Sequence, residues 1–158
     1  MAAATSIMRA QQIVLGRVDA MLRPFQLTFA RYEALVLLLF SREGALPLGK
    51  MGTRLMVHPT SVTNTVNRLE KQGFVRRLPH PTDGRATLAE ITPAGRAVVE
   101  KATGVLVEAR FGLESLAEEE AVELTRLVRT LREAVGDFET GSNVVKIPGG
   151  SPGHQPRS

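Results

Sequence analysis

The fold is decided by residues 47–74, which read PLGKMGTRLMVHPTSVTNTVNRLEKQGF. Apolar residues recur at helical spacing on both sides of a short break, and Pro59 follows this break directly. Proline is favoured in the first turn of a helix and glycine just after its last turn. We therefore predict a short helix over residues 47–55, a tight turn over 56–58 and a second helix over 59–72.

The second helix of this pair has two chemically different faces. Val62, Val66 and Leu69 are spaced i, i+4, i+7 and must pack on the core. The other face carries hydroxyls, amides and cations, with no carboxylate in its N-terminal half; such groups hydrogen-bond base edges and phosphates. Ser, Thr and Asn are also poor helix formers, so we favour a recognition face over an ordinary solvated surface. The residues of this face are Thr60, Asn64, Asn67 and Lys71, flanked by Ser61, Thr63 and Arg68.

Two helices are predicted before this pair. The apolar spacing over residues 7–22 indicates a helix that Pro24 ends. Thr28 is a suitable N-cap for the next helix, which extends to about Ser41. Residues 35–40 are apolar on nearly every side, so this second helix should be central and buried.

A β-hairpin is predicted directly after the pair. Residues 74–78 and 86–91 are short β-compatible runs on either side of a segment dense in turn residues, and Ala89 and Ile91 should face inward. Arg85 lies near the tip, where an arginine can enter a narrow minor groove, and Asp83 could hold its guanidinium in place. An exposed loop salt bridge of little energetic value is the equal alternative.

The rest of the chain is expected to be helical and then irregular. A long helical region starts at Thr92-Pro93, and Gly112 is a candidate break. The S-x-x-E pattern of Ser115 and Glu118 predicts a capping box for a last helix with an apolar stripe. Residues 141–158 are rich in Gly, Pro and Ser, and we predict a flexible tail there.

Composition narrows the functional class. Residues 42–90 carry eight Lys or Arg against four Asp or Glu, whereas residues 91–140 carry six against ten. A basic middle segment suits a phosphate-contacting module attached to a separate scaffold, although modest positive charge is also common on solvated surfaces. The absence of Cys excludes disulfides, thiolate metal sites and cysteine redox switches. We expect a cytoplasmic protein without membrane contact, because the apolar run at residues 34–40 is too short for a span.

The predicted order of helix, short helix, tight turn, helix and hairpin is the winged helix-turn-helix layout, over residues 28–92. The predicted fold class is mainly α with a small β-hairpin wing. The order of motifs resembles the MarR family from about residue 7 to residue 138. The motifs that carry this resemblance are Leu27-Thr28, Tyr32–Leu35, Thr60–Thr63, Arg68–Arg77, Asp83–Arg85 and Ile91–Gly95.

The resemblance implies a domain over residues 1–140 and a homodimer in which helices of segments 7–24 and 93–138 interlock. It also implies a recognition helix in a major groove and a wing in the adjacent minor groove, on a pseudo-palindromic double-stranded DNA operator. By this match Thr60, Ser61, Thr63 and Asn64 face bases, Arg68 holds the backbone and Arg85 is the wing arginine steadied by Asp83; Pro59 at the helix start completes the candidate DNA-binding residues. Ligand-responsive repression, with a small aromatic or anionic ligand between the dimer helices and the winged parts, is a further expectation of the resemblance.

Three positions depart from the family pattern. Asn64 stands where many members have Arg, so their base preference does not carry over. Asn67 stands where many have Asp, which removes a carboxylate that could pair with Arg77 and support the hairpin. Gly52 is a weak helix former where the family favours Ala, which predicts a mobile short helix.

Other functional classes fit the sequence less well. The three histidines and the scattered carboxylates form neither a nucleophile–base set nor a metal-ligand spacing, so we expect no enzyme, no metal and no cofactor. A winged helix used for protein–protein contact should have an apolar or acidic outer face, unlike residues 59–72. Nonspecific architectural DNA binding remains an alternative, and RNA binding lacks an aromatic stacking platform.

Overall fold

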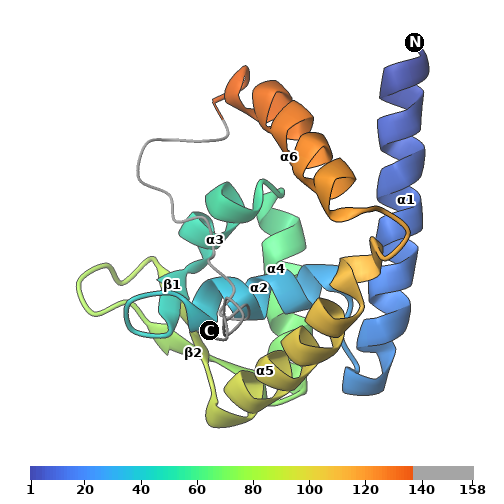
Figure 1. The fold of residues 1–158 in the computed structure, drawn as a ribbon. Coiled ribbons are helices and arrows are strands. Elements are labelled where there is room, and N and C mark those ends of the chain that lie inside the picture. The colour runs from blue at the N-terminus through green and yellow to red at the C-terminus, as the bar shows by residue number, and fades with distance from the viewer. Residues whose placement is uncertain (137–158) are drawn as a thin grey trace, which may run out of the picture. The chain divides into compact units, whose positions relative to one another are not determined.

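The structure is a computed structural model that describes residues 1–136. It is mainly helical with a small three-stranded antiparallel sheet, which confirms the predicted fold class (Figure 1). The chain divides into two compact units, residues 1–113 and the residues from Glu114 onward. The predicted flexible tail over 141–158 lies outside the described residues. The helices are α1 (Ala2–Leu22), α2 (Phe29–Leu39), α3 (Leu48–Leu55), α4 (Pro59–Lys71), α5 (Pro93–Glu108) and α6 (Glu118–Glu133), and the strands are β1 (Ala45–Pro47), β2 (Val75–Pro79) and β3 (Thr87–Ile91).

Helix α2 is the buried centre of the first unit, as its apolar sequence predicts. Leu35 and Leu38 have no exposed surface, and Tyr32 is 5% exposed. The helix packs against α1, α4 and α5, which surround it in Figure 1. Full burial of one leucine side chain stabilises a fold by about 1.5–3 kcal/mol. The core around α2 therefore holds the surrounding helices in place.

The start of α2 is fixed by a residue of α1. Thr28 occupies the N-cap position, but its side chain makes no capping hydrogen bond. Instead the backbone N–H of Phe29 donates to the carboxylate of Asp19 at 2.6 Å. A carboxylate at a helix N-terminus also interacts favourably with the helix dipole. The predicted role of Thr28 is thus taken by Asp19, across the turn at Arg23–Phe25.

Helices α3 and α4 meet at a tight turn that depends on two backbone features. Met56 has a left-handed conformation with φ of 53°, and the N–H of Val57 donates to the carbonyl of Gly52 at 3.1 Å. A Cβ atom at Gly52 would lie 3.3 Å from Cγ2 of Val62 and 3.4 Å from the carbonyl oxygen of Val57. Glycine at position 52 therefore has a packing reason: it allows α3 to lie close against α4.

The sheet contains a strand that the sequence analysis did not predict. Residues 45–47 form β1, which pairs with β3 in the order β1-β3-β2. Pro47 was expected in the first turn of the short helix, but it ends β1 with φ of −59° and ψ of 138°, and α3 starts at Leu48. A proline is tolerated there because β1 is an edge strand. Ala89 and Ile91 face inward as predicted, with exposures of 0% and 4%.

Thr92 joins the end of the hairpin to the end of α4. Its hydroxyl accepts from the N–H of Gly95 at 3.0 Å and donates to the carbonyl of Gly73 at 2.7 Å. Its own N–H donates to the carbonyl of Phe74 at 3.0 Å. This brings the first turn of α5 so close to residue 74 that a Cβ atom at Gly95 would lie 2.1 Å from the Phe74 oxygen. Only glycine fits at position 95.

The second unit contains α6. Its N-cap is Ala117, whose N–H is accepted by the Glu120 carboxylate at 2.8 Å. The predicted capping box at Ser115 and Glu118 is therefore wrong by two residues, because Glu120 occupies the third helical position. The expected apolar stripe is largely exposed in this chain: Leu124, Leu127 and Leu131 of α6 are 42%, 53% and 57% exposed, and Val135, just after the helix, is 72% exposed. Val128, its fifth predicted member, is partly buried.

We expect Gly95→Ala to lower the free energy of unfolding by about 1–3 kcal/mol, because the added methyl group collides with the backbone at Phe74. The matched control is Gly104→Ala in the same helix, where nothing lies within 4 Å of the new Cβ atom. Its higher helix propensity should raise stability by up to about 1 kcal/mol. Denaturant unfolding measures both variants, and a Gly95→Ala variant as stable as the unchanged protein would contradict this packing.

Candidate DNA-binding surface

Helix α4 carries its two predicted faces in the folded chain. Val62, Val66 and Leu69 are 2%, 0% and 0% exposed. This stripe belongs to the same core as Leu35 and Leu38 of α2. The predicted site residues of this helix are all exposed to solvent: Pro59, Thr60, Ser61, Thr63, Asn64 and Arg68.

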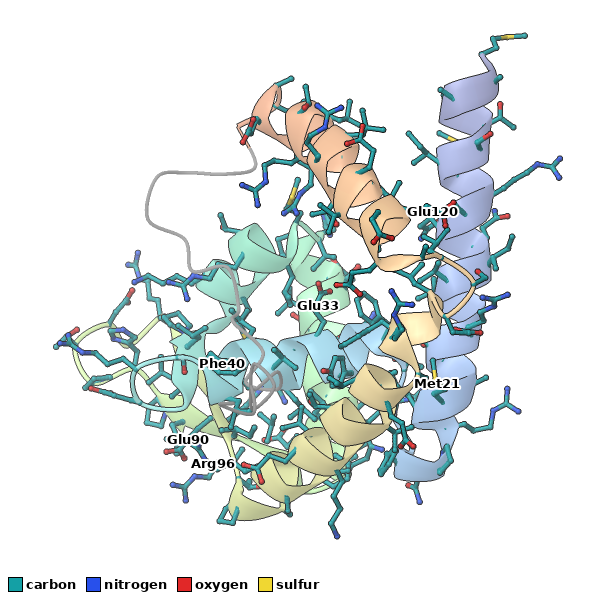
Figure 2. All side chains as sticks on the ribbon, viewed as in Figure 1. Met21, Glu33, Phe40, Glu90, Arg96 and Glu120 are labelled. Carbon is teal, nitrogen blue, oxygen red and sulfur yellow. The ribbon has the colours of Figure 1, made fainter. Side chains whose placement is uncertain are left out.

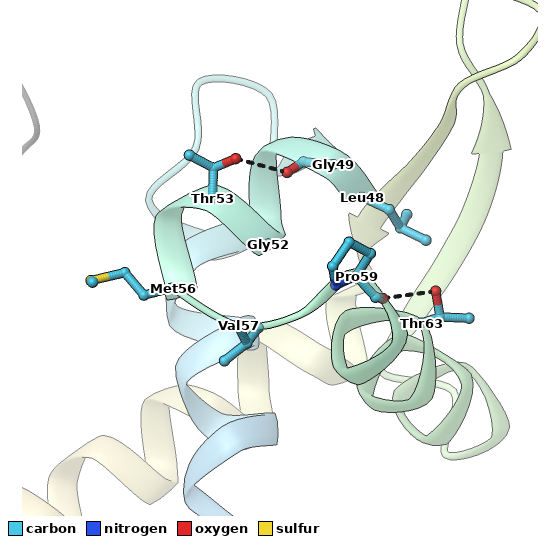
Figure 3. Close-up of a pocket in the computed structure, with 8 residues that line it drawn as sticks. All are labelled: Leu48, Gly49, Gly52, Thr53, Met56, Val57, Pro59 and Thr63. Carbon is cyan, nitrogen blue, oxygen red and sulfur yellow. Dashed lines mark hydrogen bonds between the residues drawn. The ribbon is translucent and has the colours of Figure 1, made fainter.

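The exposed residues of α4 lie along three lines parallel to the helix axis: one beside α3, one opposite the buried stripe and one beside α2. Pro59 and Thr63 border a groove of about 500 Å³ between α3 and α4, whose other lining residues include Met56 and Val57 (Figure 3). The hydroxyl of Thr63 donates to the carbonyl of Pro59 at 3.1 Å, so it already has one backbone partner. Helical spacing of 100° per residue places Thr60 and Asn64 directly opposite the buried stripe.

Ser61 lies along the third line, on the edge of α4 that faces α2. It borders a small cavity of about 60 Å³ together with Glu33 of α2 and Thr65. Burial raises the pKa of the Glu33 carboxyl, which Figure 2 labels on α2. Helical spacing places Arg68 on the same edge as Ser61, two turns along the helix. The predicted face therefore extends from this edge, through Thr60 and Asn64, to the groove at α3.

The N-terminus of α4 is organised by a side chain that the sequence analysis did not select. Nδ1 of His58 accepts from the backbone N–H of Thr60 at 3.2 Å. No acidic residue lies in the first turn of this helix. A helix N-terminus without a carboxylate keeps its positive dipole end available for anions such as phosphate.

The wing consists of β2, β3 and the loop between them, residues 80–86. Pro81 to Arg85 are all exposed, so Asp83 and Arg85 lie at the tip as predicted. Nδ1 of His80 accepts from the backbone N–H groups of Thr82 and Asp83, at 3.3 and 3.2 Å. The carboxylate of Asp83 accepts from the backbone N–H of Arg85 at 3.0 Å. Asp83 therefore orders the backbone of the loop, and the predicted contact with the Arg85 guanidinium is absent in the described part of the chain.

Arg77 on β2 connects the wing to α4. Its guanidinium donates to the amide oxygen of Asn67 at 2.6 Å and forms an ion pair with Glu70. Its backbone N–H also donates to the Glu70 carboxylate at 3.3 Å. The hairpin therefore keeps its support although position 67 carries no carboxylate. The amide still accepts from Arg77, and Glu70 supplies the carboxylate.

The outer face of the sheet carries a second ion pair, between Arg76 of β2 and Glu90 of β3. The hydrogen bond from Arg76 and the nearby charge of Arg96 hold the pKa of the Glu90 carboxyl below its ordinary value (Figure 2). The cross-strand register places Arg76 directly opposite Glu90. This pair is a surface feature of the wing, because 64% of the Arg76 side chain is exposed.

Three contributors to this surface were not among the predicted site residues: His58, His80 and Glu70. Proline at residue 59 marks residue 58 as an N-cap, so the position of His58 was available from sequence. The use of His58 as a hydrogen-bond acceptor was not available from sequence.

Within residues 1–136 no cluster of three or more His, Asp or Glu side chains could hold a metal ion. No helix in the same range is long and apolar enough to cross a membrane.

We expect Arg77→Ala to loosen the wing and lower the free energy of unfolding by about 1 kcal/mol, because two hydrogen bonds to α4 are lost. Arg76→Ala is the matched control on the adjacent residue, where an exposed pair contributes little to stability. Thermal unfolding of the two variants should show a lowered midpoint for Arg77→Ala alone. Equal midpoints would mean that Arg77 does not couple the wing to α4.

Comparison with known proteins identifies the family to which this chain is similar. A family model described as the MarR family matches residues 29–87, the part from α2 to the start of β3. The HTH-type transcriptional regulator Mb0904 of Mycobacterium bovis is 39% identical over 62 residues. That match spans 39% of this chain and 43% of the relative, so the chain matches less than half the length of this relative.

Solved structures extend the likeness beyond the winged part. The chain is 60% identical to Sco5413, a MarR family transcriptional regulator from Streptomyces coelicolor, with a TM-score of 0.84 over 88% of this chain and 96% of that one. Sco3205 from the same organism, solved in complex with DNA, shares the fold at 24% identity, with a TM-score of 0.74 over 84% of each chain. Taken with the match to Sco5413 over nearly the full length of both proteins, these likenesses show that the chain belongs to the MarR family of transcriptional regulators.

Proposed function

We propose that this protein is a homodimeric, sequence-specific double-stranded DNA-binding repressor whose recognition helix is α4. One observation carries the proposal: α4 buries Val62, Val66 and Leu69 while the opposite side offers Thr60 and Asn64 to solvent without a carboxylate. Hydroxyl and amide groups read base edges, whereas an acidic face would repel the DNA backbone. Pro59, Ser61, Thr63 and Arg68 complete the proposed contacts of this helix.

The wing supplies the second proposed contact. Arg85 lies at an exposed loop tip whose backbone is ordered by Asp83. An arginine in this position suits the narrow minor groove, where the negative potential is enhanced. Support also comes from relatives that share the fold, because Sco3205 and a mutant of Escherichia coli MarR were solved with DNA, the latter with operator DNA.

The homodimer is proposed from apolar surface that this chain leaves exposed. Leu124, Leu127 and Leu131 line one face of α6, and Ile7 and Ile13 are 48% and 57% exposed on α1. Faces of this kind are stable in water only when another surface covers them. A two-fold dimer presents two recognition helices, which predicts a pseudo-palindromic operator with half-sites about one helical turn apart.

Control by a ligand is the part of the proposal that rests on family membership alone. A small aromatic or anionic molecule would bind between the dimer helices and the winged parts and change the spacing of the two recognition helices. The protein would act in the cytoplasm without catalysis of its own.

A winged helix used for protein–protein contact is the second candidate function. The polar and basic outer face of α4 disfavours it.

In vitro selection from random duplex DNA at near-physiological salt tests the proposal. We expect enrichment of an inverted repeat, because a two-fold dimer with base-reading helices selects both half-sites together. Binding that only fades as salt rises, with no enriched sequence, would leave nonspecific electrostatics and favour an architectural role. Absence of binding would favour the protein-contact alternative.

Substitution separates the two proposed contacts. We expect Asn64→Ala to change which sequences are selected, because an amide can discriminate base edges at roughly 1–3 kcal/mol. Arg85→Ala should weaken binding to selected and scrambled duplexes by similar factors, because the wing arginine responds mainly to the negative potential of the groove. Competition binding with both duplexes measures this difference. An unchanged sequence preference in Asn64→Ala would mean that α4 presents a different face to DNA.

A further inference from the structure

Two histidines accept hydrogen bonds from backbone N–H groups, one in each of the two elements of the proposed DNA interface. His58 lies at the N-terminus of α4, and its Nδ1 accepts from the N–H of Thr60 at 3.2 Å. His80 lies at the base of the wing loop, and its Nδ1 accepts from the N–H groups of Thr82 and Asp83 at 3.3 and 3.2 Å. The only other histidine of the sequence, His154, lies outside the described residues.

The hydrogen bonds from the three backbone N–H groups require the neutral form of each imidazole, whereas the hydroxyl of Thr82, 3.3 Å from Nδ1 of His80, can pair with either form. A neutral imidazole accepts at one ring nitrogen and carries its proton on the other, whereas both nitrogens are donors in the protonated form. Protonation therefore changes Nδ1 of each ring from an acceptor into a donor. The backbone N–H groups that face it can then no longer donate to it. Histidine is the side chain that ordinarily changes charge between pH 5 and 8.

These caps also suit a surface that meets phosphates. Aspartate is a common N-cap residue, but it would place a negative charge where the DNA backbone is proposed to lie. A neutral imidazole supplies the acceptor without that charge. The pattern at His80, an acceptor for backbone N–H groups two and three residues later, is the one that Asn and Asp side chains form in loops.

We propose that His58 and His80 are positioning residues of the DNA interface, which hold the start of α4 and the wing tip in their binding conformation only while both imidazoles are neutral. This inference rests on the proposed DNA-binding function. Protonation frees the N–H groups of Thr60, Thr82 and Asp83, so a smaller fraction of the protein has both elements preorganised. The apparent affinity for the specific site falls with that fraction.

Other charged groups near each histidine do not reproduce this effect. Lys50 and Arg54 lie on α3, which packs against α4, and their charges do not change between pH 5 and 8. Glu33 faces α4 from α2 on the side of Ser61, and burial raises the pKa of its carboxyl. Its protonation leaves the acceptors for Thr60, Thr82 and Asp83 in place, and a variant that replaces only the two histidines retains it. Around the wing loop the charged residues are Asp83 and Arg85 of the loop, Arg76 and Arg77 of β2, and Glu90 of β3.

The sign of the pH effect distinguishes this device from simple electrostatics. Protonation adds two positive charges near the proposed interface, which strengthens nonspecific attraction to phosphates. Loss of the caps acts in the opposite direction on the specific complex. We therefore expect the ratio of specific to nonspecific affinity to fall on acidification, even where the nonspecific affinity rises.

The experiment compares binding to the selected duplex and to a scrambled duplex at about pH 8.0 and about pH 5.5, the range over which histidine titrates. One cap of ordinary strength corresponds to about fivefold in an equilibrium constant, so the specificity ratio should fall by up to about 25-fold when both are lost. The control is the double variant H58N/H80N, because Asn accepts from the same N–H groups without titrating. Its specificity ratio should not change between the two pH values. His58→Ala should show a reduced ratio already at pH 8.0.

An NMR measurement on the protein without DNA makes the test independent of the proposed function. The amide resonances of Thr60, Thr82 and Asp83 should shift together with the C–H resonances of the two imidazole rings as the pH falls. In H58N the shift of Thr60 should disappear while those of Thr82 and Asp83 remain. Amide resonances that do not follow the ring protons would overturn the inference.

The outcomes separate the two hypotheses. Specific binding at pH 8.0 with a ratio that falls equally in the unchanged protein and in H58N/H80N would overturn the role of the histidines and leave the proposed function intact. No specific binding at pH 8.0 would overturn the proposed function, and with it the role in DNA binding, while the NMR titration still decides whether the caps exist. A ratio that falls in the unchanged protein alone, with coupled amide titrations, is the expected result.

Discussion

The structure depends on the burial of the α4 stripe in the core around α2. Val62, Val66 and Leu69 are almost fully buried, and this fixes the rotation of α4 about its own axis. Because side chains repeat every 100° around a helix, the same constraint decides that Thr60 and Asn64 point away from the protein. Burial of the apolar face therefore keeps the polar face of α4 exposed to solvent. Without the buried stripe, a helix with the same hydroxyls and amides would not be held in one orientation.

Two sets of contacts attach the wing to α4. Thr92 bonds to the backbone at residues 73 and 74, directly after α4, and Arg77 reaches back to Asn67 and Glu70 within the helix. Backbone contacts fix the root of the hairpin, while Arg77 connects the first strand of the hairpin to the C-terminal half of α4. In the proposed complex, this geometry would let the helix and the wing tip approach a duplex as one body, which lowers the entropy cost of ordering them on binding.

Much of the winged part could be predicted from sequence because its signals are local. The two faces of α4 follow from helical spacing, and the inward-facing Ala89 and Ile91 follow from strand alternation. The rest depends on contacts between elements: Asp19 of α1 caps α2 from ten residues away, and Glu70 meets Arg77 because β2 packs back against α4. Strand β1 was missed because a three-residue run ending in proline has no pattern of its own and exists through its pairing with β3.

We propose that α4 enters the major groove of a specific site while the wing contacts the minor groove beside it. Methylation interference with dimethyl sulfate on the selected duplex tests both parts at once, because guanine N7 lies in the major groove and adenine N3 in the minor groove. We expect N7 methylation within each half-site to block binding. We also expect N3 methylation at the flanking positions to interfere with binding, and Arg85→Ala to abolish this second interference. Interference confined to the minor groove, or none at guanine N7, would contradict the assignment of α4 as the recognition helix.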